Sequence, residues 1–127
     1  MSRKAWVRFF AVAALFNFAA GLPQLIDPIG NSAMLGLVVE HTPVMERIAG
    51  LLVVCFGVIY AMIATNMDRF RDLLIVAVAG KTGVFIIIGH YWLAGALPLV
   101  PMIVGTMDLL FGIGFLAFLL TVPRAAR

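Results

Sequence analysis

The chain has 127 residues, of which 64% are hydrophobic and only 12% are charged. A soluble domain is usually about half apolar and about a quarter charged, so this composition argues against a water-soluble fold and predicts lipid as the solvent. The formal net charge is +3, and the single cysteine, Cys55, excludes an internal disulfide.

Four long apolar windows follow one another along the chain, at residues 6–22, 45–65, 73–92 and 100–122. Each approaches the roughly 20 residues that a helix needs to cross about 30 Å of hydrocarbon. Unpaired backbone groups are costly in lipid, so each window is predicted to be a helix. Prolines, glycines and a polar segment at residues 66–72 separate the windows. The sequence therefore predicts an all-α fold, a transmembrane four-helix bundle that forms a single domain over residues 1–127.

The first window follows Ser2-Arg3-Lys4, a start that also fits a secretory signal peptide. A clear cleavage site does not follow it, so we expect an uncleaved first helix. The next connection, residues 23–44, is the longest, and Pro23 is expected to end the first helix. Within this connection, Asp27-Pro28 predicts a helix cap with proline at the first helical position. The apolar residues that follow are too few to span, so they predict a short interfacial segment between the first two helices.

Glu46 and Arg47 open the second window at its outer end. We assign them as an outer gate, in which Arg47 could reach the preceding connection; the alternative is a helix-end ion pair. His41 and His90 also fall near the outer end, and with Glu40, Met45 or Glu46 they could hold a metal. Two histidines without a fixed ligand spacing are a weak signal, so we expect neither a metal site nor catalytic residues.

Lys81 is the only charge in the third window between Leu73 and Ile88. Gly80-Lys81-Thr82 matches the end of a phosphate-binding loop, but that pattern needs a glycine at position 75, where this chain has Ile75. The preceding residues also lack the composition of a loop. A nucleotide-binding role is therefore disfavoured, and the lysine needs another explanation.

The distribution of basic residues predicts the orientation. With the N-terminus inside, only Arg47 lies on the outer side, whereas the inner side carries Arg3, Lys4, Arg8, Arg69, Arg71, Arg124 and Arg127. This asymmetry follows the positive-inside rule. It predicts a multi-pass protein of the cell inner membrane with both termini in the cytoplasm. The basic residues are not interleaved with aromatic ones in a patch, so we expect no nucleic-acid partner.

Lys81 and Asp108 are predicted to lie at similar depths. At a rise of about 1.5 Å per residue, Lys81 is about 13 Å from the inner face and Asp108 about 12 Å from the outer face. In a core about 30 Å thick, their levels then differ by about 5 Å, which a lysine side chain can bridge. A lone charge at this depth costs several kcal/mol. We therefore predict that the two residues pair, either as a structural contact or as part of a functional pocket.

Asn17 is predicted near the midplane and Tyr60 slightly nearer the inner face, so both are assigned to the same polar pocket as hydrogen-bonding partners. Small residues surround these polar positions, and they let membrane helices approach closely. The main ones are Ala13, Ala14, Gly21, Gly50, Gly57, Ala77, Gly80, Gly83, Gly105 and Gly112. The polar side chains are therefore expected on the faces through which the helices touch.

Two stretches in the first half of the chain carry short glycine-containing motifs. Gly21-Leu-Pro-Gln-Leu-Ile-Asp-Pro28 and Glu46-Arg-Ile-Ala-Gly50-Leu-Leu-Val-Val-Cys-Phe-Gly57 resemble the end of the first helix and the start of the second in the DoxX-like family of small four-helix membrane proteins. Gln24 stands where that family usually has lysine, and Lys81 and Asp108 match no family position. The resemblance implies Gly21, Glu46, Gly50 and Gly57 as family positions. It also implies an accessory subunit of a membrane oxidoreductase, of quinone-linked sulfur oxidation or of an oxidative-stress system.

The leading functional hypothesis is a non-catalytic membrane protein that binds a small amphipathic molecule, a quinone or a lipid, or docks a membrane redox partner. No cofactor of its own is expected, and the lipid bilayer is the predicted surrounding. One alternative is a small proton-coupled transporter, for which four spans are few, so it would need a homo-oligomer. The other is a membrane-embedded enzyme acting at the outer face through His41, Glu46 and His90.

Overall fold

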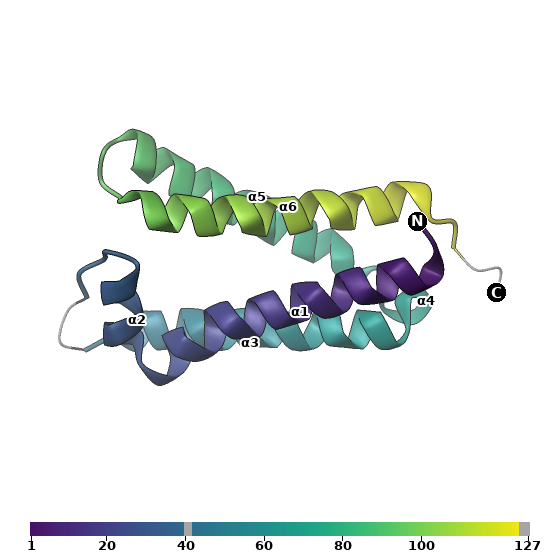
Figure 1. Ribbon diagram of the computed structural model, residues 1–127, viewed down its shortest axis with the longest axis horizontal. Helices are drawn as coiled ribbons and strands as arrows, with labels where there is room; N and C mark the ends of the chain where they lie inside the picture. The colour runs from purple at the N-terminus through teal and green to yellow at the C-terminus, as the bar shows by residue number, and fades with distance from the viewer. Residues whose placement is uncertain (40–41, 125–127) are drawn as a thin grey trace. The chain divides into compact units, whose positions relative to one another are not determined.

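The computed structural model describes residues 1–39 and 42–124, and these residues form helices without strands. The elements are α1 (Arg3–Ile26), α2 (Pro28–Met34), α3 (Val44–Thr65), α4 (Met67–Phe70), α5 (Leu73–Leu93) and α6 (Leu99–Thr121) (Figure 1). Within the described residues, α1, α3, α5 and α6 are each long and apolar enough to cross a membrane. The prediction of an all-α, multi-pass membrane protein with four spans is therefore confirmed. The bounds of α3, α5 and α6 match their predicted windows to within one residue, whereas α1 begins three residues earlier and ends four residues later than predicted.

The chain divides into two compact units, Met1–Asn66 and Met67–Arg127. In the first unit, α1 and α3 lie side by side in opposite directions, and α2 packs against α1 (Figure 1). In the second unit, α5 and α6 form another helical hairpin. We call these the first and second hairpins and describe each by itself.

The backbones of α1 and α3 touch in the first hairpin. A Cβ added to Gly50 would lie 2.6 Å from the backbone nitrogen of Leu25 and 2.9 Å from the carbonyl oxygen of Gly21. A Cβ on Gly21 would in turn lie 2.9 Å from the carbonyl oxygen of Gly50. Such an approach requires glycine on both helices. The prediction that Gly21 and Gly50 lie on the contact faces is therefore confirmed.

Pro23 lies inside α1, so the prediction that it ends the first helix is wrong. The helix continues to Ile26, and the N–H of Asp27 donates to the carbonyl of Pro23 at 2.9 Å. Proline lacks one N–H and crowds the preceding turn, which weakens a helix locally. Here the turn after Pro23 is held from outside, because the backbone of Leu25 rests on Gly50 and the carbonyl of Leu25 accepts a hydrogen bond from Arg47.

The connection after α1 contains the helix cap that the sequence predicts. The Asp27 carboxylate accepts a hydrogen bond from the N–H of Gly30 at 3.0 Å, and Pro28 occupies the first turn of α2. This arrangement satisfies a backbone donor that the start of a helix otherwise leaves unpaired. Gly36, with φ of 74°, then turns the chain out of the helix. The predicted short segment between the first two spans is thus helical, and its location at the membrane interface stays a prediction.

In the second hairpin, the glycines of α6 face α5. A Cβ on Gly105 would lie 3.2 Å from Ile88, and one on Gly112 would lie 3.1 Å from the Cβ of Lys81. Gly80 and Gly83 of α5 differ, since no atom of the described residues, apart from the adjacent residues and the local backbone of α5, lies within 4 Å of a Cβ built there. The prediction of a contact face is therefore confirmed for α6, whereas the glycines beside Lys81 lie on the open side of α5.

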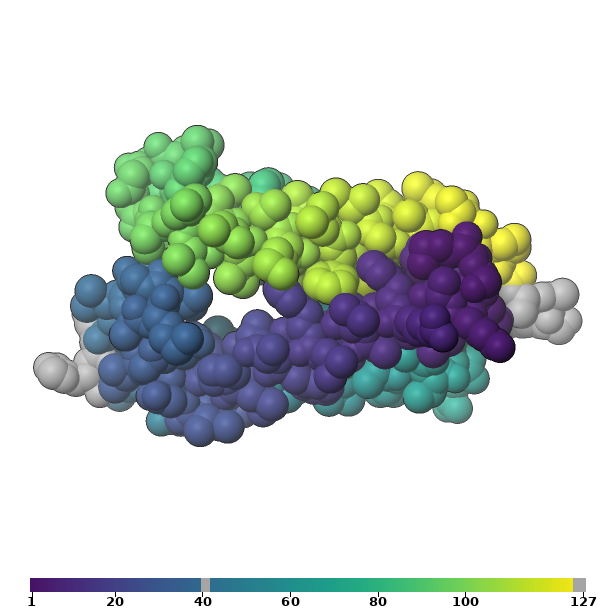
Figure 2. Space-filling model, viewed as in Figure 1, coloured from purple at the N-terminus to yellow at the C-terminus, as the bar shows by residue number. Residues whose placement is uncertain are grey.

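The outward sides of α5 and α6 carry large apolar side chains. Exposed examples are Ile75, Ile86, Leu110, Ile113 and Leu120. Figure 2 shows α6 along its whole length, from green to yellow. Apolar side chains in contact with the surroundings are what a bilayer favours, so these sides are suited to face lipid.

Candidate functional site

Lys81 and Asp108 form an ion pair between α5 and α6, as the sequence predicts. The Nζ of Lys81 donates a hydrogen bond to the Oδ1 of Asp108. The lysine side chain is 4% exposed and the aspartate side chain 18%. Both residues lie in the interior of their helices, well away from the polar ends. We call these two residues the intramembrane pair.

One face of α6 surrounds the lysine with aromatic rings. The Lys81 ammonium lies 5.9 Å from the ring centroid of Phe111 and 5.8 Å from that of Phe115, and Phe115 is fully buried. Gly112, four residues after Asp108, leaves the space through which the lysine stem passes. A cation near aromatic faces is stabilised by the negative potential of the rings. The site therefore holds its positive charge with a carboxylate and two rings, all supplied by about two turns of α6.

This arrangement has defined chemical abilities. An ammonium group has three N–H donors, and a carboxylate has two acceptor oxygens. The pair can therefore donate to a carbonyl or accept from a hydroxyl of a ligand while it keeps its own contact. The more exposed member is Asp108, so access to the pair is through the carboxylate. Gly80-Lys81-Thr82 lies in the middle of α5 rather than in a loop, which argues against a phosphate-binding loop there.

Asn17 and Tyr60 both belong to the first hairpin. Asn17, only 5% exposed, donates through Nδ2 to the carbonyl of Val53 in α3 at 3.1 Å. Gly57 makes room for it, since a Cβ there would lie 3.2 Å from the Cβ of Asn17. Tyr60, one turn beyond Gly57, is buried beside the ring of Phe56 at 6.2 Å. Both residues are thus buried within the first hairpin, and their predicted hydrogen bonds to the intramembrane pair stay a prediction.

Arg47 reaches the end of α1. One guanidinium nitrogen donates to the carbonyl of Leu25 at 2.7 Å and to that of Ile26 at 3.3 Å. The last carbonyls of a helix lack partners within the helix and carry partial negative charge, so a cation there is favourable. Arg47 therefore reaches the outer connection as predicted, and within the described residues it does not form the alternative ion pair with Glu46. The gating role of Glu46 and Arg47 stays a prediction.

The residues of the alternative outer-face metal or enzyme site are described only in part. His90 lies near the end of α5, with its ring centroid 5.4 Å from that of Tyr91. His41 lies outside the described residues. Across the part of the chain that is described, His, Cys, Asp and Glu side chains do not gather in groups of three that could hold a metal ion.

Arg71 is a buried polar residue whose role the sequence did not indicate. It is 8% exposed, donates to the carbonyl of Leu119 in the last turn of α6, and lies 5.1 Å from the ring centroid of Phe118. The sequence signal was its position just before α5, opposite the end of an antiparallel neighbour. From the sequence, Arg71 contributed only to the prediction of orientation, as one of the basic residues on the inner side.

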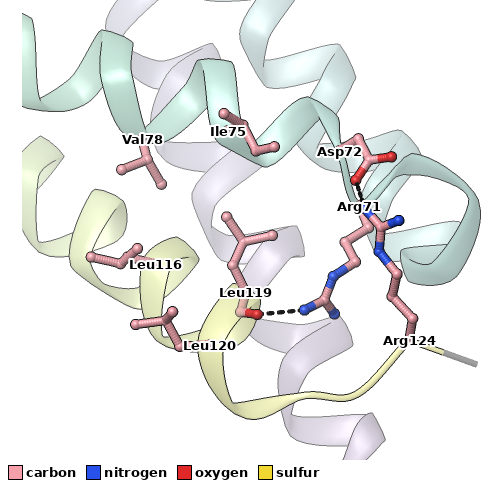
Figure 3. A pocket seen from close by; sticks show the side chains of 8 residues that line it. All are labelled: Arg71, Asp72, Ile75, Val78, Leu116, Leu119, Leu120 and Arg124. Carbon is pink, nitrogen blue, oxygen red and sulfur yellow. Dashed lines mark hydrogen bonds and ion pairs between the residues drawn. The ribbon is translucent and has the colours of Figure 1, made fainter.

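A groove opens beside Arg71, between the start of α5 and the end of α6 (Figure 3). Its volume is about 390 Å³. The apolar lining comes from Ile75, Val78, Leu116, Leu119 and Leu120, and the polar lining from Arg71, Asp72 and Arg124. Arg124 and Asp72 form an ion pair at the rim. We call this feature the α5–α6 groove.

Comparison of the chain with known proteins gives no family assignment. No family model, curated protein or solved structure matches the chain. The resemblance to the DoxX-like family accordingly stays a prediction that depends on Gly21, Glu46, Gly50 and Gly57.

Proposed function

We propose that this chain is a small inner-membrane protein that binds an amphipathic molecule, a quinone or a lipid, at the intramembrane pair. Asn17 and Tyr60 would add hydrogen bonds, and Glu46 and Arg47 would lie at the outer entrance. Such a protein would serve as an accessory subunit of a membrane redox system, as the DoxX-like resemblance implies. The distribution of basic residues supports an orientation with both termini in the cytoplasm.

The observation that carries this proposal is the unequal burial of the pair. Lys81 is enclosed, whereas Asp108 keeps 18% of its side chain exposed. Ionisable residues inside membrane spans are costly and are typically retained for ligand or ion contacts. A purely structural pair gains most when both members are enclosed, because exposure to competing partners weakens the contact. An accessible carboxylate beside a fixed ammonium offers an acceptor and a donor to one polar headgroup.

The test compares the ligand content of two folded proteins. The wild-type chain and the double variant Lys81→Met with Asp108→Leu are purified in a mild detergent, and co-purified lipids and quinones are identified by mass spectrometry. Both are then titrated with a short-chain quinone and with a lysophospholipid, with retention measured after gel filtration. We expect the double variant to remain folded and to lose at least tenfold in retention of one of the two probes. A folded double variant that retains both probes as the wild type does would show that the pair is structural.

A matched control separates the site from general damage to the protein. Asn66 directly follows α3 and lies outside the apolar spans, so Asn66→Ser should leave retention unchanged. Proton flux in liposomes, measured with a pH-sensitive dye, addresses the carrier alternative. Flux that requires Asp108 would favour transport over simple binding.

A further inference from the structure

The α5–α6 groove combines an apolar wall with a cationic rim. Five of its lining residues are aliphatic, whereas its rim carries Arg71, Asp72 and Arg124. Two arginines and one aspartate leave a formal charge of 2 − 1 = +1 at the rim. The volume of about 390 Å³ falls within the range of small-molecule pockets, about 300–1,000 Å³. A suitable occupant therefore has an apolar part and an anionic part.

The two arginines differ in how firmly they are held. Arg71 is buried, with one nitrogen on the carbonyl of Leu119 and its guanidinium over Phe118. A guanidinium carries five N–H donors, so this single bond does not exhaust it. Arg124 lies at the surface, and its ion pair with Asp72 is 66% and 68% exposed. An exposed pair of this kind contributes little stability, so Arg124 can exchange the carboxylate for another anion.

The position of the groove along the helices indicates that the anionic part of the occupant is a lipid headgroup. Arg71 and Asp72 come directly before α5, and Arg124 follows α6 by three residues, so the polar rim lies where two predicted spans leave the hydrocarbon. Ile75, Val78 and Leu116 extend the apolar wall from the rim into the spans (Figure 3). A free anion would gain nothing from this wall, whereas a phospholipid matches both parts.

We propose that the α5–α6 groove is a binding site for an anionic phospholipid. Its phosphate would contact Arg71 and Arg124, and one acyl chain would lie along Ile75, Val78 and Leu116. Asp72 competes with the lipid phosphate for Arg124 and so limits the affinity. This site goes beyond the proposed ligand site at Lys81, and it does not depend on that function, because the groove lining ends at Val78, one turn before Lys81.

The test uses the full-length protein in detergent, with native mass spectrometry during titration by phosphatidylglycerol or phosphatidylcholine with identical acyl chains. The wild type should retain more of the anionic lipid. Arg124→Gln should weaken phosphatidylglycerol binding about fivefold, the effect of one basic residue near a charged lipid surface. Asp72→Asn should strengthen it by a similar factor, since it removes the competing carboxylate. Both changes should alter phosphatidylcholine binding less, because the choline cation of that lipid offsets the charge of its phosphate.

Two controls complete the experiment. Arg47→Gln removes an arginine at the other end of the spans and should leave the lipid preference unchanged. Leu116→Trp fills the apolar wall and should reduce retention of both lipids equally. Glycerol phosphate, the headgroup without chains, should not compete. Equal retention of the two lipids by the wild type would overturn the proposal, as would an unchanged preference in Arg124→Gln and Asp72→Asn, or displacement by glycerol phosphate.

Discussion

Lys81 on α5 donates a hydrogen bond to Asp108 on α6, twenty-seven residues away in the chain. The contact joins the only two charged residues in the interiors of these helices. It makes the second hairpin electrically neutral at that level and fixes the register between its helices.

The first prediction concerns the mutual dependence of these two charges. Lys81→Met or Asp108→Leu alone should destabilise the fold by roughly 3–5 kcal/mol, because each leaves one buried charge without its partner. The double variant should recover most of this loss, since two apolar side chains replace the pair. Thermal unfolding in detergent and the yield of monodisperse protein measure the effect. Single variants as stable as the wild type would show that the pair does not hold the hairpin together.

The second prediction concerns the glycine contact in the first hairpin. Gly50→Ala places a methyl group 2.6 Å from the backbone nitrogen of Leu25, so α1 and α3 must separate. Overpacking of this kind typically costs about 1–3 kcal/mol. Gly83→Ala is the matched control, because its added Cβ meets open space in the described chain. It should leave stability unchanged or raise it by up to about 1 kcal/mol through lower backbone entropy. Equal losses in both variants would contradict the close approach of α1 and α3.

The third prediction tests the hydrogen bond of Asn17. Asn17→Leu keeps a similar side-chain volume but removes the donor to the Val53 carbonyl. Hydrogen bonds between membrane helices are worth about 0.6 kcal/mol on average, up to about 1.7 kcal/mol. The unfolding midpoint should therefore fall only slightly, by less than in the single variants of the intramembrane pair. A loss as large as that of Lys81→Met would assign Asn17 a further essential contact.

The fourth prediction compares two arginines of the second hairpin. Arg71→Met removes a charged donor from the Leu119 carbonyl and should cost about 2 kcal/mol. Arg124→Met breaks an exposed ion pair and should cost less than about 1 kcal/mol. Both are measured in lipid-free detergent, so that lipid binding does not contribute. The order of the two effects is the decisive result, and a reversed order would contradict the buried role of Arg71.

The fifth prediction concerns orientation. In a Cys55→Ala background, single cysteines at Ser2 and at Thr42 are labelled in intact cells with a membrane-impermeant maleimide. Thr42→Cys should react from outside and Ser2→Cys only after lysis, because the basic residues cluster on the side of Ser2. The opposite pattern would invert the proposed topology.

Sequence patterns were sufficient for much of this fold, and their failures have physical causes. The long apolar windows predicted all four spans, and the estimated depths of Lys81 and Asp108 correctly predicted that the two residues pair. Asp27-Pro28 predicted the cap of α2 because capping depends on adjacent residues alone. The prediction that Pro23 ends the first helix was wrong because the turn after it packs against Gly50. This tertiary contact overrides the local preference of proline.

The α5–α6 groove and the bond from Arg71 to Leu119 lay beyond sequence patterns for another reason. They join residues 48 positions apart, and a periodic pattern does not specify which side chain meets a helix end. The sequence pattern also does not specify which face of α5 is turned toward α6. Gly80 and Gly83 flank Lys81 in sequence, yet they lie on the open side of the helix. Proximity in sequence therefore did not indicate which small residues would face α6.

The direct contact of Gly21 with Gly50 has a consequence for permeation. Because the two backbones are in contact, the interface between α1 and α3 leaves no space at that level. Neither water nor an ion can pass along it unless the helices separate. Any route across the bilayer through this protein must therefore avoid the interface between α1 and α3. In the proposed orientation Asn17 lies on the cytoplasmic side of this contact, so water from the outer medium would not reach it along the interface.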